Sequence, residues 1–187
     1  MRIHALIGSA RLEFETAPSL FSPKAVDRGS VFLLSQVELQ QTDKVLDLGC
    51  GYGVMGIYAA SQCRPENVYL IDNDPIAIEL ATVNSRINAV PAVHVQYSDG
   101  LADIQEAEFT KILCNPPYHT DFSVAKRFIE KGFNRLAIGG AMWMVAKREK
   151  WYRNKLTSIF GGIRLFEEDS HFVFQAIKKR ASYARRS

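Results

Sequence analysis

The stretch Lys44-Val45-Leu46-Asp47-Leu48-Gly49-Cys50-Gly51-Tyr52-Gly53-Val54-Met55-Gly56 decides the fold of this chain of 187 residues. Its first five residues are mostly apolar and predict a short buried strand. Glycines 49, 51 and 53 follow, and glycine adopts positive φ values and lets a ligand approach the backbone. A helical pattern begins after them, and the first amides of a helix are free to bind an anion. The stretch therefore predicts a strand, a tight turn and a helix that bind a ligand together.

Strands and helices alternate along the rest of the chain. This alternation is typical of an α/β fold, in which helices cover both faces of a mainly parallel sheet. Two short apolar segments near the C-terminus predict a hairpin that adds an antiparallel strand, and another short hairpin begins the chain. The predicted strands are 3–7, 12–15, 44–48, 68–74, 93–97, 111–114, 141–146, 163–166 and 172–177, and the predicted helices are 29–39, 54–63, 75–87, 122–136 and 149–160.

Two aspartates mark the ends of the first two parallel strands. Asp47, directly before the glycines, suits a cationic ammonium group, and the helix amides after the glycines suit a carboxylate. Asp72 ends the next strand, at the place where a pair of ribose hydroxyls is held in folds of this kind. Together these groups indicate a ligand in which an amino acid is joined to a nucleoside.

A NAD-dependent oxidoreductase is the rival interpretation. The segment Gly51–Gly56 matches the dinucleotide fingerprint G-x-G-x-x-G by itself, and Asp72 follows at about the expected 20 residues. This interpretation ranks second, because Asp47 places an acid where a pyrophosphate favours none and Gly49 is an additional glycine.

The tetrapeptide Asn115-Pro116-Pro117-Tyr118 follows an apolar strand and suits the activation of a planar amine. The lone pair of such an amine is delocalised, so the amine is a poor nucleophile. The Asn115 side-chain oxygen and the Pro116 carbonyl can each accept one of its hydrogens, which directs the lone pair and stabilises developing positive charge. The prolines keep the loop stiff, and the Tyr118 ring offers a stacking surface.

These motifs together resemble those of the class I S-adenosylmethionine-dependent methyltransferases. Asp47–Gly53 is similar to their motif I, and Asn115–Tyr118 is similar to the signature of the branch that methylates amino groups. The chain most resembles the methyltransferase small domain family, which contains ribosomal RNA guanine-N2 methyltransferases of both subunits and compact archaeal relatives. The resemblance implies a Rossmann-like seven-stranded sheet, S-adenosyl-L-methionine as the cofactor, and methylation of an exocyclic amine, above all that of guanine in ribosomal RNA.

The resemblance also implies a role for each matching residue. The glycine turn and Asp47 would surround the methionine part of the cofactor, Asp72 would bind the ribose, and Asn73 and Asp99 would contact the adenine. The segment Asp27–Ser30 would close over the cofactor carboxylate. The implied cofactor-binding residues are Ser30, Asp47, Gly49, Cys50, Gly51, Gly53, Asp72, Asn73, Asp99 and Gly100, and the implied catalytic residues are Asn115, Pro116, Pro117 and Tyr118.

Two departures from the family pattern leave the target open. The guanine-modifying members usually have Phe at the position of Tyr118. They also have an N-terminal RNA-recognition domain, and we expect this chain to work without one, with a homodimer as one source of a second surface. The same loop occurs in adenine amino-methyltransferases and in protein glutamine methyltransferases. These two targets remain alternatives, since all three are planar amines or amides.

Composition restricts the class of protein. With 187 residues, 47% of them hydrophobic and 23% charged, the chain fits a single domain, 1–187, in which 1–20 form a hairpin extension. The three cysteines have no metal-ligand spacing and cannot all pair, which favours a cytoplasmic protein with reduced thiols and no metal. No stretch reaches the roughly 20 apolar residues of a membrane span.

Charge is unevenly distributed and indicates a polyanionic partner. Residues 1–99 contain 7 Lys and Arg against 11 Asp and Glu, whereas residues 100–187 contain 16 against 9. If residues 100–187 bind the substrate, their excess of positive charge favours RNA. The segment Lys147–Lys155 mixes five cations with two aromatic residues, which suits RNA contact or, alternatively, a solvated helix with Trp151 packed inward. Residues 179–187 predict a flexible basic tail.

Overall fold

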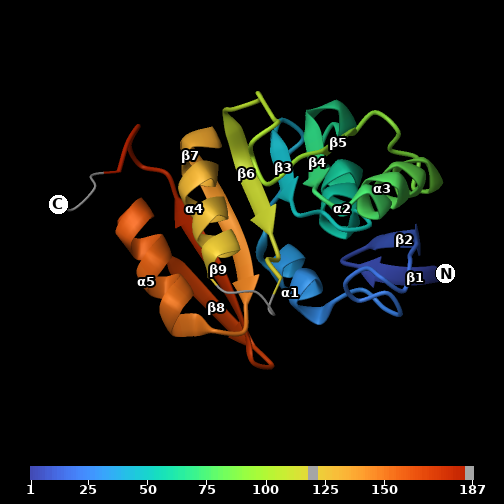
Figure 1. Ribbon diagram of the computed structural model, residues 1–187, viewed down its shortest axis with the longest axis horizontal. Coiled ribbons are helices and arrows are strands. Elements are labelled where there is room, and N and C mark those ends of the chain that lie inside the picture. Colours follow the sequence, from blue (N-terminus) through green and yellow to red (C-terminus); the bar gives the residue numbers. More distant parts are fainter. Residues whose placement is uncertain (118–121, 184–187) are drawn as a thin grey trace.

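The central sheet has seven strands in the order β5-β4-β3-β6-β7-β9-β8, as Figure 1 shows for a computed structural model that describes residues 1–117 and 122–183. The N-terminal hairpin forms a separate two-stranded sheet. The strands are β1 (Arg2–Ile7), β2 (Ala10–Glu15), β3 (Val45–Leu48), β4 (Val68–Asp72), β5 (His94–Tyr97), β6 (Phe109–Cys114), β7 (Leu136–Ala146), β8 (Arg164–Glu168) and β9 (His171–Ile177).

The direction of the strands confirms the predicted fold class. All neighbouring pairs from β5 to β7 are parallel, whereas β9 runs antiparallel to both β7 and β8. The strand order reverses between β3 and β6, because the chain first builds outward to β4 and β5 and then returns. In open α/β sheets, ligands bind at the carboxyl ends of the strands at such a reversal.

Helices cover both faces of the sheet, and each face has its own hydrophobic core. Along β7, Trp143 and Val145 belong to the core under α1, α2, α3 and the hairpin, whereas Met142 and Met144 belong to the core under α4 and α5. This alternation follows from the two-residue period of a strand. The helices are α1 (Arg28–Gln36), α2 (Val54–Gln62), the short 3₁₀ helix η1 (Pro65–Asn67), α3 (Pro75–Ile87), α4 (Ser123–Arg135) and α5 (Glu149–Phe160).

Local signals account for the bounds of α3 and α5. The Asp74 side chain accepts a hydrogen bond from the N–H of Ile76 (2.9 Å), and Pro75 takes the first helical position. Both features favour a helix start. The helix α5 ends at Gly161, whose φ of +83° lies in the left-handed region that glycine adopts readily. Both predicted helices are confirmed.

The strand β7 begins at Leu136 instead of at residue 141, the predicted start. Apolar residues at helical spacing predicted a helix from Phe122 through Leu136, but α4 ends at Arg135 and the chain passes directly into the strand. Leu136 is fully buried and pairs with Phe109. It fills the core in either conformation, so the spacing of apolar residues alone could not locate the change from helix to strand.

Near the C-terminus, Lys178 and Tyr183 contact the rest of the protein, whereas residues 179–182 between them are exposed. Lys178 is buried and its Nζ donates to the carbonyl of Leu136 (2.7 Å). The Tyr183 ring meets the Phe133 ring edge-on, with 5.1 Å between the ring centres. The other residues of the predicted basic tail, 184–187, lie outside the described residues. None of the described helices has the length and apolar character that crossing a lipid bilayer requires.

Two asparagines, Asn84 in α3 and Asn88 at its C-terminal cap, hold the N-terminal hairpin against the rest of the protein. The Asn88 side chain accepts from the N–H of Glu13 (3.0 Å) and donates to its carbonyl (2.7 Å), and Asn84 makes the same pair of bonds with Glu15 (2.7 and 2.9 Å). Each carboxamide therefore pairs with the N–H and the carbonyl of one residue on the outer edge of β2, as a neighbouring strand would. Asn84 is fully buried and also donates to the carbonyl of Tyr52 (2.8 Å).

We expect Asn84→Ala to lower the free energy of unfolding by about 1–3 kcal/mol, because it leaves the buried carbonyl of Tyr52 and the partly buried backbone groups of Glu15 without these partners. Urea denaturation followed by circular dichroism measures the change. Asn154→Ala, at an exposed position of α5, is the matched control and should shift the midpoint little. Equal midpoints for the two variants would show that the asparagine contacts do not stabilise the hairpin.

Candidate active site

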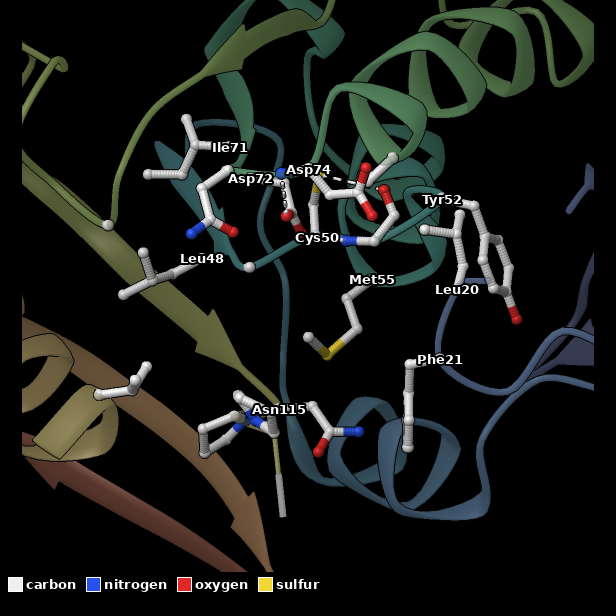
Figure 2. Close-up of a pocket in the computed structure, with 18 of the residues that line it drawn as sticks. Leu20, Phe21, Leu48, Cys50, Tyr52, Met55, Ile71, Asp72, Asp74 and Asn115 are labelled. Atoms are coloured by element: carbon white, nitrogen blue, oxygen red, sulfur yellow. Dashed lines mark hydrogen bonds between the residues drawn. The ribbon is translucent and has the colours of Figure 1, made fainter. Parts of the chain in front are cut away.

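A cavity of about 470 Å³ opens at the carboxyl ends of β3, β4 and β6, where the strand order reverses. Its wall includes residues 19–22, 48–52, 71–74, 98–100 and 115–117. Figure 2 shows Asp72 and Asn115 on opposite sides of this space, with Met55 between them in this view. Volumes of roughly 300–1,000 Å³ are typical of small-molecule sites, so the cavity has the size for a nucleoside-like ligand.

The end of β4 fixes the turn that follows β3. The N–H groups of Gly49 and Cys50 both donate to the carbonyl of Ile71 (2.9 Å each), and the N–H of Gly51 donates to Asp72 Oδ2 (2.8 Å). Gly49 and Gly51 have φ values of +75° and +53°, which residues with a side chain rarely adopt. The turn therefore exposes its backbone to the cavity, and β3 and β4 together fix its position.

Asp47 lies beneath the cavity wall. Its side chain is fully buried, and its Oδ2 accepts the N–H of Gly56 in α2 (2.6 Å). The other oxygen, Oδ1, has no hydrogen-bond partner among the described residues. Burial raises the pKa of Asp47 to about 7, to which the charge of Asp72 adds, while the bond from Gly56 opposes the rise. A nearby cation would stabilise this carboxylate, and a contact with an ammonium group stays a prediction.

Asp72 is held at the wall by backbone amides. Its Oδ2 accepts from Gly51 (2.8 Å) and its Oδ1 accepts from Asp74 (3.0 Å). These bonds fix both oxygens, and each oxygen keeps a further lone pair for a ligand. Asn73, the next residue, is exposed and also lines the cavity. The arrangement suits a pair of adjacent hydroxyl groups beside a planar ring.

Asp99 forms an ion pair with Arg127 of α4, at distances of 2.9 and 3.3 Å between guanidinium nitrogens and carboxylate oxygens. Both side chains are about half exposed, at 53% and 47%, and both residues line the cavity. The ion pair uses one lone pair on each Asp99 oxygen, and each oxygen keeps another for the adenine amine that it was predicted to bind. Sequence reasoning missed Arg127, because a cation on the polar side of an amphipathic helix has no motif of its own.

The carboxamide of Asn115 has a fixed orientation. Its Nδ2 donates to Asp27 Oδ2 and to Ser30 Oγ, at 2.9 Å each. Both hydrogens of the amide are therefore used, and a carboxylate such as Asp27 can only accept. The Asn115 Oδ1 is buried and has no hydrogen-bond partner among the residues that the structure describes. An unpaired buried acceptor is costly, so this oxygen is suited to a donor supplied by a ligand.

A segment that sequence reasoning did not assign to the site closes the cavity on the hairpin side. Phe21 lines the cavity and its side chain is 51% exposed. The next residue, Ser22, has a φ of +52°, and its carbonyl accepts from the hydroxyl of Tyr52 in the glycine turn (3.1 Å). Figure 2 shows Phe21 beside Asn115 and Met55. The segment thus brings an exposed aromatic ring to the site.

The structure brings most of the predicted site residues together around one space. Asp47 and Gly53 do not line the cavity, and Tyr118 lies outside the described residues. The predicted residues that do line it are Ser30, Gly49, Cys50, Gly51, Asp72, Asn73, Asp99, Gly100, Asn115, Pro116 and Pro117.

The charged side chains of the described wall favour a cationic ligand. Asp27, Asp72, Asp74 and Asp99 line the cavity, and Arg127 is the cation among the lining residues that are described. Such a wall repels a pyrophosphate and attracts a positively charged group. The charge therefore argues against the dinucleotide interpretation.

Comparison with known proteins identifies the family. The model of the methyltransferase small domain matches residues 11–175. The chain belongs to the methyltransferase small domain family. It is 32% identical over 170 residues to the ribosomal RNA large subunit methyltransferase G of Aeromonas hydrophila, covering 86% of this chain and 44% of that protein. It is 34% identical over 170 residues to the ribosomal RNA small subunit methyltransferase C of Hamiltonella defensa, covering 88% and 50%.

A solved structure of the same kind matches nearly the whole chain. It is the 16S ribosomal RNA N2-guanine methyltransferase of T. thermophilus in complex with AdoMet and guanosine, with a TM-score of 0.85 and 27% sequence identity. The match covers 95% of this chain and 50% of that one. This member of the methyltransferase small domain family therefore spans about half the length of these ribosomal RNA methyltransferases.

The buried Asp47 should make the stability of this methyltransferase domain depend on pH. The ordinary pKa of an aspartate is about 4 and that of folded Asp47 is about 7, so between these values the folded state binds the proton more tightly. The contribution of Asp47 to stability is then largest at low pH, falls by about 1.4 kcal/mol for each pH unit between the two values, and levels off above them. We expect the stability difference between Asp47→Asn and wild type to change in favour of the variant as pH rises through this range.

Urea denaturation of the ligand-free protein at several pH values measures this difference. Asp47→Asn keeps an acceptor for the N–H of Gly56 and removes only the charge, and comparison with wild type cancels the contribution of all other titrating groups. A stability difference that stays constant from about pH 5 to about pH 7 would show that Asp47 does not carry the raised pKa.

Proposed function

We propose that this chain is an S-adenosylmethionine-dependent methyltransferase that methylates the exocyclic amine of guanine in ribosomal RNA, in the cytoplasm, with residues 1–187 acting as one methyltransferase domain. The observation that carries the proposal is the orientation of Asn115. Its amide hydrogens are held by Asp27 and Ser30, so its unpaired oxygen can accept from an amine at the point where the strand order reverses.

The residues of the cavity fit the cofactor. The wall carries four aspartates against one arginine among its described residues, which suits the sulfonium and ammonium charges. The buried Asp47 beneath it has an oxygen without a partner among the residues described. The glycine turn, the first turn of α2 and Ser30 would hold the methionine part, Asp72 the ribose, and Asn73, Asp99 and Gly100 the adenine. When bound, the cofactor supplies a methyl group that is electrophilic because it is attached to a positively charged sulfur.

The chain's own residues prepare the attacking amine. Asn115 Oδ1 accepts one amine hydrogen and the Pro116 carbonyl accepts the other, so the nitrogen lone pair is directed out of the ring plane. Both acceptors become more effective as positive charge develops on the nitrogen, which lowers the barrier to transfer. Water can remove a proton from the resulting ammonium, so this site needs no general base. His119, next to the loop, lies outside the described residues.

Two observations favour guanine in RNA over the other targets. Ribosomal RNA is the named substrate class of the relatives, and the T. thermophilus structure contains guanosine beside AdoMet. The adenine amine and the glutamine amide have the same donor geometry, so Asn115 and Pro116 would serve them equally well. A single experiment distinguishes these targets.

The test is transfer of labelled methyl from S-adenosylmethionine into total RNA, and separately into total protein, from cells that lack this gene. We expect label in RNA, recovered as N2-methylguanosine after digestion, and much slower labelling when the Asn115→Ala variant is used. Label in N6-methyladenosine or in protein glutamine would replace the guanine assignment. No transfer to either fraction would contradict the proposed activity.

We expect Asn115→Ala to lower the turnover number by about 10²–10³, the usual effect of losing one preorganised polar group. Binding of S-adenosylmethionine, measured by isothermal titration calorimetry, should stay near the wild-type value, because Asn115 acts on the amine. Asn134→Ala, on the helix α4 and away from this cavity, is the control and should keep full turnover. Wild-type turnover in the Asn115 variant would refute its assigned role.

Asp27→Ser should lower turnover by about tenfold, because serine keeps a helix-capping side chain but is too short to hold the Asn115 amide. If Asp27 acts only through Asn115, the double variant Asp27→Ser with Asn115→Ala should be no slower than Asn115→Ala alone. Single-turnover rates of the four proteins provide this test. Losses that multiply in the double variant would show that Asp27 acts independently of Asn115.

A further inference from the structure

Three exposed cations lie at the starts of the helices α4 and α5. These helix starts are near the loop that begins at Asn115, called the catalytic loop below. Lys126 is in the first turn of α4, which follows β6 and the loop, and Arg148 and Lys150 follow the end of β7. The strands β6 and β7 are parallel neighbours and end together, with Cys114 opposite Met144. Figure 1 shows both helices beginning at the edge of the sheet where these two strands end.

An aromatic stack joins the starts of the two helices. The rings of Phe122 and Trp151 lie 4.2 Å apart at an angle of 11°, and Tyr152 meets both rings edge-on. The Arg148 guanidinium lies over the Phe122 ring, 5.5 Å from its centre. A guanidinium in such a cation–π contact keeps its hydrogen-bond donors available. The Phe122 ring therefore restrains the exposed Arg148 side chain without using its hydrogen-bond donors.

The three cations are not neutralised within the described part of the chain. Neighbouring cations form ion pairs there: Arg153 with Glu149, Lys155 with Glu130, and Arg127 with Asp99. Lys126, Arg148 and Lys150 form none with the residues that the structure describes. Unpaired cations clustered on one surface attract a polyanion.

We propose that Lys126, Arg148 and Lys150 form a phosphate-binding ledge for the RNA strand that carries the target base. This proposal rests on the proposed function, and it adds the part of the surface on which the RNA would lie. A base can reach the cavity only when it is unpaired, so the flanking nucleotides approach as a single strand. Their phosphates would lie beside the loop that holds the base, on the ledge.

The stack reconciles both interpretations of the segment Lys147–Lys155. Trp151 packs against Phe122 and Tyr152, as expected for a structural residue, while Arg148 and Lys150 remain exposed, as expected for RNA contact. Trp151 therefore supports the ledge instead of contacting the bases. RNA is favoured over an acidic peptide because the ledge adjoins the site that the proposed function assigns to an RNA base. The guanidinium itself would bind a phosphate or a carboxylate through two parallel hydrogen bonds, so an acidic peptide is included in the test.

The test compares the double variant Arg148→Ala/Lys150→Ala with the control Arg64→Ala/Arg86→Ala, which removes two exposed cations from the acidic half of the chain. Fluorescence anisotropy measures the affinity for a short guanine-containing single-stranded RNA at several salt concentrations. We expect the ledge variant to bind at least tenfold more weakly at low salt. The slope of log affinity against log salt should decrease by about 1.4, or about 0.7 for each phosphate that the variant no longer neutralises. The control should keep the wild-type slope.

Kinetics separate this proposal from the proposed function. In the ledge variant the KM for RNA should rise, the turnover number at saturating RNA should remain at the wild-type value, and cofactor affinity by calorimetry should be unchanged. Equal slopes and KM values for ledge variant, control and wild type would overturn the ledge while leaving the enzyme's activity intact. If the wild type neither binds S-adenosylmethionine nor transfers methyl to RNA, the proposed function itself fails. Binding to a polyglutamate peptide that equals or exceeds binding to RNA would also overturn the ledge as an RNA surface.

Discussion

The amide group of a carboxamide has two hydrogens and one oxygen, and at Asn115 the surrounding structure decides which of them is left without a partner among the described residues. Asp27 and Ser30 are acceptors at 2.9 Å from its nitrogen, so the reverse orientation would place the amide oxygen against a carboxylate. The repulsion between two acceptors makes that orientation unfavourable. The same two residues begin α1, where Asp27 caps the helix by accepting from the N–H of Ser30 (2.9 Å). One acid thus starts a helix and orients the amide of Asn115, for which we propose a role in the reaction.

This constraint links Asn115 to Ser30 and Asp27, which lie 85 and 88 residues earlier in the chain. The helix α1 packs on the sheet through Phe32, Leu33 and Leu34, which are all buried. Any movement of α1 along the sheet would therefore move the acceptors of the Asn115 amide. The position of the Asn115 amide therefore depends on how α1 packs on the sheet. Only Ser30 of this helix belongs to the predicted cofactor site.

The sequence predicted those parts of the site that depend on neighbours in the chain. The glycine turn and Asp72 were found because a strand followed by glycines has few other conformations, and a strand of known length determines where its last residue lies. The contact of Asp27 with Asn115 was not predicted, because only the packing of α1 on the sheet brings the two residues together. Asp47 was predicted to meet an ammonium group; the alternation of residues in β3 places its side chain on the α2 face with Val45, behind the cavity wall, and the contact stays a prediction.

The predicted start of β7 was wrong for a related reason. Leu136 is apolar and buried whether it ends a helix or begins a strand, so periodicity did not locate the transition. Arg127 was missed because a cation on a polar helix face has many possible partners, and only the fold shows that Asp99 is the one it meets. In each case the local pattern indicated the type of element correctly, while the contact depended on residues distant in sequence.

The distribution of charge suits separate places for the two proposed ligands, the cofactor and the RNA backbone. The described cavity wall carries four aspartates and one arginine, whereas Lys126, Arg148 and Lys150 form no ion pair with described residues at the starts of the neighbouring helices. The acidic cavity repels a phosphate and the basic helix starts attract it. At equal distance, the repulsion between like charges is as large as the attraction between opposite charges. A neutral base is not repelled and can enter where its own phosphates cannot. The acids that suit a cationic methyl donor would therefore also exclude the RNA backbone, so that a flipped base is the part of the substrate that reaches Asn115.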